Sequence, residues 1–578
     1  MQRDQFILDF NPLVVDLFAG GGGMSEAIEL ALNRHADLAL NHSADAISMH
    51  EANHPQSRHL IADVREVCPY HATNGRDVAY LHMSPDCRDH SQAKGGQPRD
   101  RKIRALSWVG VHWAGTVRPQ VISIECVKQL LAWSPMIAKR DKATGRVVKL
   151  DGSVAAKGEH VPLEKQFLVP DPKRKGKTWD RFVAILRGMG YVVDWKVSRA
   201  CDFGAPTTRE RLMVIARCDG KPIVWPAPTH SKDGADGTQR YRTAADCIDF
   251  TLPSKSIFNR KKDLAGPTLR RIAVGIDREV LRHANPFVVP VSGKMDRESA
   301  PLTPHAVDAD QSRDTAIGSP VLVQVGYGER DGQAPRALNI RQPLGTVVAG
   351  GAKHAVATAY LAQMNGGFND LRGVPGHDLR RPISSITRKG SQQQLITASL
   401  AHLRGNCDAR SVRDPLQTIS AAGQHHAVVQ CVLSPELEAG ARRVATFLKE
   451  HGIDLPATHD TLAGMNDGEV ATVVIDGITY VIVDILLRML SSAELFSCQG
   501  FPQNYILERG HDGREFSQSK QIHMCGNSVS PPWAAAFLRA NLPHLTLPGK
   551  GPKGTRRPNQ PTGRATSVQQ GLLDRVAA

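Results

Sequence analysis

Short apolar runs alternate with segments of helix-forming composition over the first 217 residues of the chain. The first run, Leu13 to Phe18, is followed by Ala19, four consecutive glycines and a helix-forming segment from Met24 to Leu32. This order predicts a strand, a glycine turn and a helix. Further apolar runs follow at residues 38–40, 78–83, 121–124 and 212–216. Strands that alternate with helices predict an α/β domain with a doubly wound parallel sheet.

The pattern changes after Trp225 and Pro226. For about 250 residues, short β-like runs are broken by Gly, Pro and Asp, and helix-like periodicity resumes only near Ile482. These runs predict a second, β-rich domain. We therefore expect an α/β domain over residues 1–225 and a β-rich domain over residues 226–518.

Two further segments lack apolar periodicity. Residues 139–177 are rich in Lys, Gly and Pro, and this composition predicts a solvated connecting loop. Residues 549–578 carry six Lys or Arg against Asp574 alone, which is typical of a disordered basic tail.

An internal repeat occupies about residues 341–433 of the second domain, in three copies. Each copy has an Arg two positions before a proline and a His or Gln eleven positions after it. The recurring side chains are Arg341, Arg380 and Arg413, with His354, Gln393 and His426. Two interpretations stay open: these side chains project toward nucleic acid, or the copies form a structural β meander whose prolines begin turns.

The composition indicates a folded protein with a polyanionic partner. With 578 residues, 41% of them hydrophobic, the chain is long enough for two domains or more, and disorder throughout is excluded. Lys and Arg exceed Asp and Glu by 15, which favours nucleic acid as the partner.

The cysteines and the apolar runs bear on the environment of the chain. The ten cysteines stand singly, with no zinc-ligand spacing, so neither a disulfide framework nor a metal site is expected. No segment approaches the ~18 apolar residues of a membrane span, and the first twelve residues lack the apolar core of a signal peptide. We expect a reduced, cytoplasmic protein.

Reactive side chains follow the predicted strands in a definite order. A glycine turn alone serves NAD, FAD, S-adenosylmethionine and nucleotides alike. Here it is followed by Cys87 in Ser-Pro-Asp-Cys, by Glu125 in Ile-Glu-Cys-Val, and by Thr-Thr-Arg-Glu-Arg, which contains Arg209 and Arg211. The carboxyl ends of parallel strands converge on one crevice, so these groups are expected to share a site with the glycine turn.

This series of motifs resembles that of the cytosine-C5 DNA methyltransferases. Residues 16–23 look like the cofactor loop of that family, residues 85–91 like its nucleophile loop, and residues 125–127 like its Glu-Asn-Val motif. Residues 209–211 look like its Arg-x-Arg motif, and residues 488–505 and 526–531 resemble its last two motifs. The variants Ser-Pro-Asp-Cys and Asn41-His42 are similar to a subgroup common in phages and prophages.

The resemblance implies an S-adenosylmethionine-dependent DNA cytosine-C5 methyltransferase that acts on double-stranded DNA, and we expect it to be monomeric. It also implies a Rossmann-like catalytic domain completed by about residues 519–548, and makes the β-rich second domain a target-recognition domain. It makes Cys87 the nucleophile that adds to carbon 6 of a flipped-out cytosine, which prepares carbon 5 for methylation. Glu125 is implied to protonate or hydrogen-bond ring nitrogen 3, and Arg209 or Arg211 to hold the O2 oxygen.

The resemblance also implies contacts to the cofactor and to DNA. The cofactor set is Phe18, Ala19, Gly20, Gly22, Asn41, Asp63, Val64, Leu106, Asn527, Ser528 and Val529. The DNA set is Ser91, Arg341, Arg380 and Arg413. Asn41 stands where much of the family has an acidic residue on the ribose, so cofactor affinity is the property that this departure affects.

Other departures from the family pattern keep two alternatives open. An RNA cytosine-C5 methyltransferase shares the family fold, although that branch has a short second domain. A catalytically inactive DNA-binding relative is suggested by the residues at positions 86, 88, 90 and 126. At the first of these, where the family often has proline, we expect Asp86 to face backbone amides of its own loop and so to keep the loop rigid.

Overall fold

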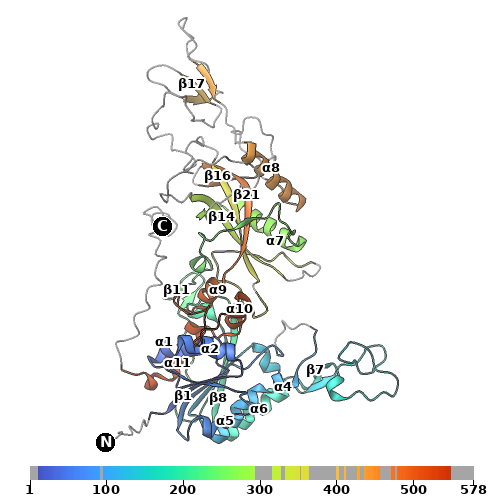
Figure 1. Ribbon diagram of the computed structural model, residues 1–578, viewed down its shortest axis with the longest axis vertical. Helices are drawn as coiled ribbons and strands as arrows, with labels where there is room; N and C mark the ends of the chain where they lie inside the picture. Colours follow the sequence, from blue (N-terminus) through green and yellow to red (C-terminus); the bar gives the residue numbers. More distant parts are fainter. Residues whose placement is uncertain are drawn as a thin grey trace. The chain divides into compact units, whose positions relative to one another are not determined.

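The computed structural model divides the chain into two compact units. The residues it describes are 11–90, 96–292, 315–326, 332–351, 353–363, 399–402, 409–411, 426–429, 435–455, 470–475 and 478–548. Unit 1 consists of Met1–Cys247, Gln342–Gly351 and Ser491–Ala578, and unit 2 of Ile248–Arg341 and Ala352–Leu490. Figure 1 shows the elements of both units, coloured along the chain.

Unit 1 contains a seven-stranded sheet with the order β3-β2-β1-β4-β5-β9-β8. Its strands are β1 Leu13–Leu17, β2 Leu38–Asn41, β3 Arg58–Ile61, β4 Val78–Met83, β5 Val121–Cys126, β8 Val192–Arg199 and β9 Glu210–Arg217. The first five run parallel to one another, whereas β9 is antiparallel to both β5 and β8.

This topology confirms the Rossmann-like α/β fold and corrects one detail of it. The sheet is not wholly parallel, because only residues 200–209 connect β8 to β9. A connection between parallel neighbours needs a dozen residues or more, so a link this short returns the chain in the opposite direction.

Helices cover both faces of this sheet. The helices of unit 1 are α1 Gly23–Leu32, α2 Ala44–Asn53, α3 Pro69–Ala72, α4 Arg101–Arg104, α5 Val109–Thr116, α6 Lys177–Gly188, α9 Ser492–Gln499, α10 Gln518–Asn527 and α11 Pro531–Asn541. On β1, Val15 and Leu17 face a core that contains Phe182 of α6, whereas Val14 faces a core that contains Ile28 of α1 and Trp533 of α11. The end of the chain therefore packs on its beginning.

Residues 136–177 are folded, although the sequence predicts a loop there. The short strands β6 Met136–Ala138 and β7 Leu168–Pro170 pair antiparallel, and Lys149 bridges to Gln166 between them. Val148 and Val161 are buried within this segment. The apolar positions of this segment are isolated and show no periodicity. The sequence therefore showed no sign of this small core. Unit 1 also contains the short pair β10 His230–Ser231 and β11 Gln239–Arg240.

Unit 2 is β-rich, as the sequence predicts, and contains an antiparallel sheet with the order β12-β21-β16-β14-β13. Its strands are β12 Lys255–Ser256, β13 Val289–Ser292, β14 Thr315–Gln324, β15 Ala337–Leu338, β16 His354–Gln363, β20 Thr472–Ile475 and β21 Ile478–Met489. A separate small sheet joins β17 Ser399–His402, β18 Ala409–Ser411 and β19 His426–Val429.

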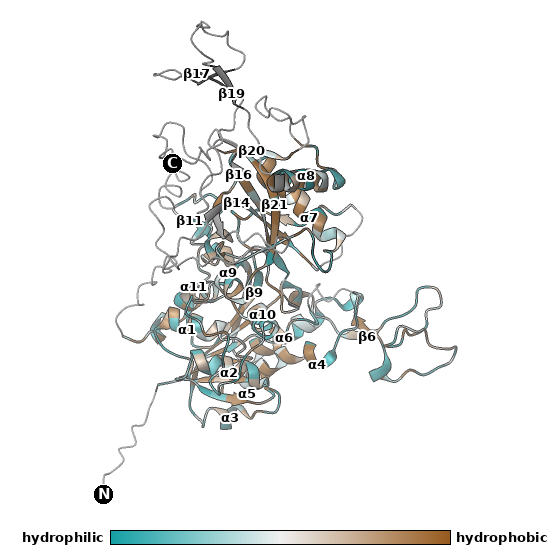
Figure 2. Ribbon diagram, turned by 45° about the horizontal axis from the view of Figure 1, so that its top comes forward, coloured by the Kyte–Doolittle hydropathy of each residue, from teal (hydrophilic) through white to brown (hydrophobic). Residues whose placement is uncertain are grey.

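The sequence analysis was wrong about two features of unit 2. Helices α7 Gly266–Ile276 and α8 Pro435–Glu450 lie within the region expected to contain only short strands. Ile482, where helical periodicity seemed to resume, lies inside strand β21. Both faces of β21 are buried, with Val483 in one cluster and Ile485 in another, and a continuous apolar run does not distinguish a strand from a helix. Figure 2 shows the resulting hydrophobic character of β16 and β21.

The boundaries of the units differ from the expected domains. Residues 226–247 and 491–518 lie in unit 1, and so does Gln342–Gly351 from the first copy of the repeat. In that segment, Leu344 is fully buried and exchanges backbone hydrogen bonds with Pro206 and Thr208 next to β9. Among the helices of the described residues, none combines the length and the apolar character needed to cross a bilayer.

The contact between α8 and β21 gives a test of the packing in unit 2. A Cβ atom at Gly440 would collide with the carbonyl oxygen of Val483, so we expect Gly440→Ala to destabilise unit 2 by about 1–3 kcal/mol. Gly188→Ala on α6 is the matched control, because nothing lies within 4 Å of its added Cβ atom. Thermal unfolding of both variants measures the difference. Equal stability of the two variants would contradict the close packing of α8 on β21.

Candidate active site

Four reactive side chains meet at one edge of the sheet in unit 1. Cys87 follows β4, Glu125 lies at the end of β5, and Arg209 and Arg211 lie at the start of β9. Because β9 is antiparallel, its beginning lies at the edge where β4 and β5 end. The structure therefore brings together all four residues that the sequence predicts to be catalytic.

Glu125 forms a buried ion pair with the two arginines. Its Oε1 atom lies 2.9 Å from Nε of Arg211 and 3.8 Å from Nη2 of Arg209. The side chains of Glu125 and Arg209 are only 6% and 3% exposed, so the pair is shielded from water. A buried carboxylate is costly unless it is paired, and the two guanidinium groups therefore fix the orientation of Glu125.

The thiol of Cys87 lies in surroundings that favour its ionisation. A hydrogen bond with Cys126 and the positive charges of Arg211 and Arg209 together lower the pKa of Cys87 to about 7, although burial and the charge of Glu125 raise it. Cys126 is buried at the end of β5, and its own pKa is raised well above 9.0, first by this hydrogen bond and then by burial. Cys126 therefore keeps its proton and donates to the sulfur of Cys87.

The sequence analysis missed this role of Cys126. It assigned no catalytic role to any cysteine other than Cys87. The available signal was its position directly after Glu125, where the family motif has Asn, another hydrogen-bonding side chain.

The loop that carries Cys87 is held by hydrogen bonds on both sides of the cysteine. Oδ1 of Asp86 accepts from the amide of Arg88 at 2.9 Å, as expected for this residue, and Oδ2 accepts from Nε of Arg88 at 2.7 Å. Arg88 is thus paired with Asp86. Oδ1 of Asp89 accepts from the amide of Asp100 at 2.7 Å, and Ser91 lies outside the described residues.

The glycine turn between β1 and α1 is open on one side and closely packed on the other. A Cβ atom at Gly20 would meet only the carbonyl oxygen of Phe18, at 3.9 Å. At Gly21, Gly22 and Gly23 it would collide with Ser528, Tyr505 and Val529, respectively. Phe18 has a φ of 62° in the left-handed region, a costly conformation that is typical of functional turns.

This turn fits a cofactor loop, and the packing refines the role of each glycine. Gly20 leaves room for a ligand beside the backbone, next to the amino end of α1. Gly22 has a φ of 84° and must be glycine because Tyr505 and His54 lie directly behind it. Its contact with the cofactor stays a prediction.

Other predicted cofactor residues lie around the same edge of the sheet. Nδ2 of Asn41 donates to Ala19 at 3.4 Å, while its Oδ1 accepts from the amide of Ser43 at 2.9 Å. The carboxylate of Asp63 is held by Arg65, a hydrogen bond that lowers the pKa of Asp63 to about 2. Val64 is buried beside it and Leu106 is half-buried.

The predicted contacts from the end of the chain fall into two groups. Ser528 and Val529 are buried against the glycine turn, at Gly21 and Gly23. Asn527 is exposed and hydrogen-bonds Nε2 of His523 at 3.0 Å.

Gln342–Gly351 supports the active site in a way that the sequence did not indicate. Nη1 of Arg209 donates to the carbonyl oxygen of Gly526 at 2.9 Å and to that of Val347 at 3.4 Å. A Cβ atom at Gly526 would collide with the backbone of Val348 and Ala349. Arg209 is therefore held by segments distant from it in the sequence, and no local motif could reveal such contacts.

The described recurring side chains of the first repeat copy have partners within unit 2. Within unit 2, Nη1 of Arg341 donates to Asn285 at 2.8 Å, and its guanidinium lies 5.4 Å from the ring centre of Phe287. His354 is buried, 3.1 Å from the side-chain nitrogen of Gln324. Contact of Arg341 with DNA stays a prediction. Arg380 and Arg413 lie outside the described residues.

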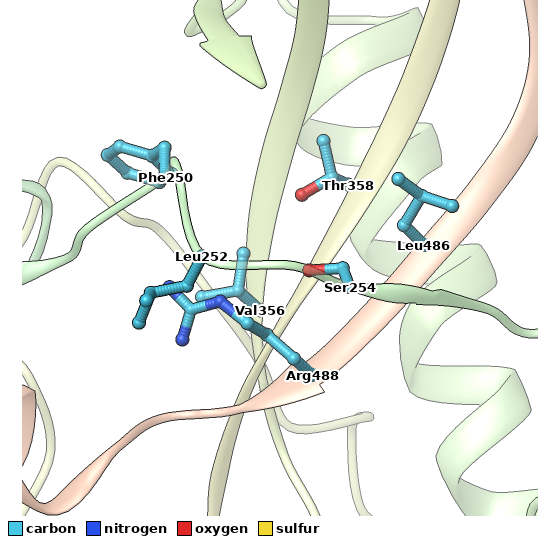
Figure 3. Close-up of a pocket in the computed structure, with 7 residues that line it drawn as sticks. All are labelled: Phe250, Leu252, Ser254, Val356, Thr358, Leu486 and Arg488. Atoms are coloured by element: carbon cyan, nitrogen blue, oxygen red, sulfur yellow. The ribbon is translucent and has the colours of Figure 1, made fainter. Parts of the chain in front are cut away.

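Two other features of the described residues do not offer comparable chemistry. Glu26, Glu29 and His54 lie close enough to hold a metal, but both ring nitrogens of His54 are engaged, by Glu29 at 2.6 Å and by Tyr505 at 3.1 Å. A small hollow in unit 2 is lined by Phe250, Leu252, Ser254, Val356, Thr358, Leu486 and Arg488 (Figure 3). This lining contains neither a thiol nor a carboxylate.

Comparisons with known proteins agree with this site. Residues 13–135 and 171–264 match the family model described as C-5 cytosine-specific DNA methylase. These segments contain Cys87, Glu125, Arg209 and Arg211. This part of the chain is therefore similar to the C-5 cytosine-specific DNA methylases.

Individual relatives match over short stretches. The Type II methyltransferase M1.HphI of Haemophilus parahaemolyticus is 37% identical over 73 residues, 13% of this chain and 18% of that protein. M.NgoBI of Neisseria gonorrhoeae is 35% identical over 69 residues, 11% of this chain and 22% of that protein. The chain thus spans less than a quarter of these curated relatives. The solved structure of the Entamoeba histolytica methyltransferase EhMeth is 11% identical, with a TM-score of 0.39 over 93% of this chain and all of that chain.

The hydrogen bond between the two thiols gives a test of the site. We expect Cys126→Ala to raise the pKa of Cys87 from about 7 toward 9.0, because the thiolate loses its hydrogen-bond donor. The rate at which iodoacetamide alkylates Cys87 should therefore rise at a higher pH than in the unchanged protein. Mass spectrometry of the labelled peptide assigns the rate to Cys87.

Two further variants control this measurement. Cys126→Ser retains an O–H donor and should shift the profile less, and Cys201→Ala removes another buried thiol of unit 1 and should leave it unchanged. An alkylation profile that is identical with and without Cys126 would show that this residue does not act on Cys87.

Proposed function

We propose that the chain is an S-adenosylmethionine-dependent DNA cytosine-C5 methyltransferase. The observation that carries this proposal is the low pKa of Cys87 beside the buried ion pair of Glu125 with Arg211. A nucleophilic thiolate and a fixed carboxylate are the groups required to activate a cytosine ring. The family match over residues 13–135 and 171–264 supports the same conclusion.

Cys87 begins the proposed reaction as a thiolate. With a pKa of about 7, a substantial fraction of its sulfur is ionised at neutral pH. The thiolate adds to carbon 6 of the cytosine, a C–S bond forms, and the electrons of the C5–C6 double bond move toward carbon 5 and the N3–O2 side of the ring. The proton of Cys126 stays in place to stabilise the sulfur before addition.

Glu125 and the arginines act on the opposite edge of the ring. Glu125 protonates or hydrogen-bonds nitrogen 3, which withdraws electron density as the sulfur adds. A guanidinium from Arg209 or Arg211 holds the O2 oxygen, where negative charge develops. Arg209 is preorganised for this by the carbonyl oxygens of Gly526 and Val347. Once carbon 5 carries the methyl group, a base removes its proton, and the C–S bond breaks to restore the C5–C6 double bond and the thiolate.

The glycine turn and its neighbours fit the cofactor. S-adenosylmethionine, when bound, supplies the methyl group. Phe18, Ala19 and Gly20 would hold it from the turn, and Asn41, Asp63, Val64 and Leu106 from the following strand ends. The Oδ1 atom of Asn41 already accepts a hydrogen bond within the protein, and the carboxylate of Asp63 is already paired with Arg65. The ribose would therefore meet a neutral amide, and the adenine a carboxylate that is already paired.

Two alternatives differ from this proposal in substrate or in activity. The size of unit 2 favours DNA over RNA, since the RNA branch of the family has a short second domain. The assembly of Cys87, Glu125, Arg209 and Arg211 favours an active enzyme over a relative that only binds DNA. Transfer of a tritiated methyl group to duplex DNA, compared with transfer RNA, separates these outcomes.

The nucleophile can be identified by covalent trapping. We expect Cys87→Ala to reduce methyl transfer to background, whereas Cys201→Ala should retain it. DNA that contains 5-fluorocytosine should form a stable adduct with the enzyme, because fluorine cannot leave carbon 5 as a cation. Peptide mapping should place this adduct on Cys87, and an adduct on another cysteine would overturn the assignment.

The role of Glu125 as an acid can be tested with a substitution that keeps the shape of the side chain. Glu125→Gln retains a hydrogen-bonding side chain but removes the acid, so we expect the single-turnover rate to fall by about 10²–10⁴-fold. Binding of S-adenosylmethionine, measured by calorimetry, should change little because the cofactor residues lie elsewhere at the sheet edge. Full activity of this variant would exclude acid catalysis by Glu125.

A further inference from the structure

A folded arm projects from unit 1 where the family model has no counterpart. We define the arm as residues 136–177, between β5 and α6; the family model leaves residues 136–170 of it unmatched. Figure 1 shows the arm extending past β7, beside α4 and α6. The pairing of β6 with β7 and the buried side chains of Val148, Ala155 and Val161 give it a fixed structure.

The surface of the arm is strongly basic. It contains eleven Lys or Arg and five Asp or Glu, an excess of six positive charges. Most of its carboxylates bind within the arm itself: Asp141 accepts from Thr144, Asp151 from Ser153, Glu159 from Lys149 and Asp171 from Arg174. Most carboxylates of the arm are thus engaged by side chains of the arm itself.

Most of the positive charges remain available. Within the described part of the chain, Lys149 and Arg174 are the cations of the arm that form ion pairs. The other nine cations have no carboxylate partner there, and the seven lysines among them are all exposed at the surface. These are Lys139, Lys142, Lys157, Lys165, Lys173, Lys175 and Lys177.

The base of the arm is attached to the loop that carries the nucleophile. The amide of Arg99 donates to Leu168 of β7 at 3.0 Å, and Nη1 of Arg99 donates to the carbonyl oxygen of Arg88 at 3.3 Å. Arg104 makes a second link, donating to Asp89 at 2.9 Å and to Ser134 at 3.4 Å. The arm therefore starts beside Cys87, where any bound substrate must reach.

We propose that the arm binds the phosphate backbone of duplex DNA that flanks the target cytosine. This inference rests on the proposed function only for the identity of the polyanion that reaches Cys87. Exposed lysines are compact charges on flexible stems, which suits phosphate contacts that do not depend on sequence. A rigid projection holds these charges in place along the backbone, so the arm adds affinity without reading bases.

The test removes three charges from the arm and compares them with three elsewhere. The arm variant is Lys142→Gln, Lys157→Gln and Lys165→Gln in the full chain. The control variant is Lys196→Gln, Lys221→Gln and Lys232→Gln, which removes the same charge from exposed lysines of unit 1 outside the arm. Fluorescence anisotropy with a duplex DNA probe gives the Kd of each protein over a range of salt concentrations.

We expect the arm variant to bind DNA more weakly and with a smaller salt dependence. Each phosphate contact contributes about 0.9 to the slope of log K against log salt, so the slope should fall by about 2–3 in the arm variant. The control variant should retain the original slope. Replacement of the same three arm lysines by arginine keeps the charge and should therefore keep the original slope. All of these proteins should show the same thermal unfolding midpoint.

The possible outcomes separate this inference from the proposed function. Methylation of DNA by the unchanged protein, with equal slopes for the arm and control variants, would overturn the arm as a DNA-binding surface. A reduced slope with no methylation of any DNA would instead support the arm and refute the enzyme activity. A loss of affinity for transfer RNA alone would overturn DNA as the partner of the arm.

Discussion

The buried ion pair between Glu125 and the arginines of β9 is the interaction on which the proposed active site depends. A carboxylate that is shielded from water is stable only if a partner compensates its charge. The antiparallel direction of β9 provides that partner, because it places Arg209 and Arg211 at the edge where β4 and β5 end. The same positive charges then act on the thiol of Cys87. One reversal of strand direction thus fixes the carboxylate and, together with the hydrogen bond from Cys126, lowers the pKa of Cys87.

Segments from distant parts of the chain keep these groups in position. Carbonyl oxygens of Val347 and Gly526 hold Arg209, and Ser528 and Val529 pack behind the glycine turn. The seven-stranded sheet therefore supplies the edge, but the later segments make the site rigid. This explains why unit 1 contains Gln342–Gly351 and the region after Ser491 as well as the first 247 residues.

Two departures from the family pattern have a physical explanation in the structure. Asp86 replaces a rigid proline, and its carboxylate bonds the amide of Arg88 and so restrains the same loop. Cys126 replaces Asn, and its thiol donates a hydrogen bond to Cys87. The first replacement keeps the loop restrained, and the second keeps a hydrogen-bonding side chain beside the nucleophile loop. These two departures are thus compatible with a thiolate at Cys87.

The sequence by itself determined the features that depend on neighbouring residues and on strand ends. The apolar run, the glycines and the helix after Leu13 are local signals, and the ends of β4 and β5 placed Cys87 and Glu125 together through topology alone. The tertiary structure decided the direction of β9, the strand at Ile482, the fold of the arm and the pairing of Cys126 with Cys87. Each of these depends on which residues become buried against distant partners, and burial on both faces removes the periodicity from which a sequence indicates its structure.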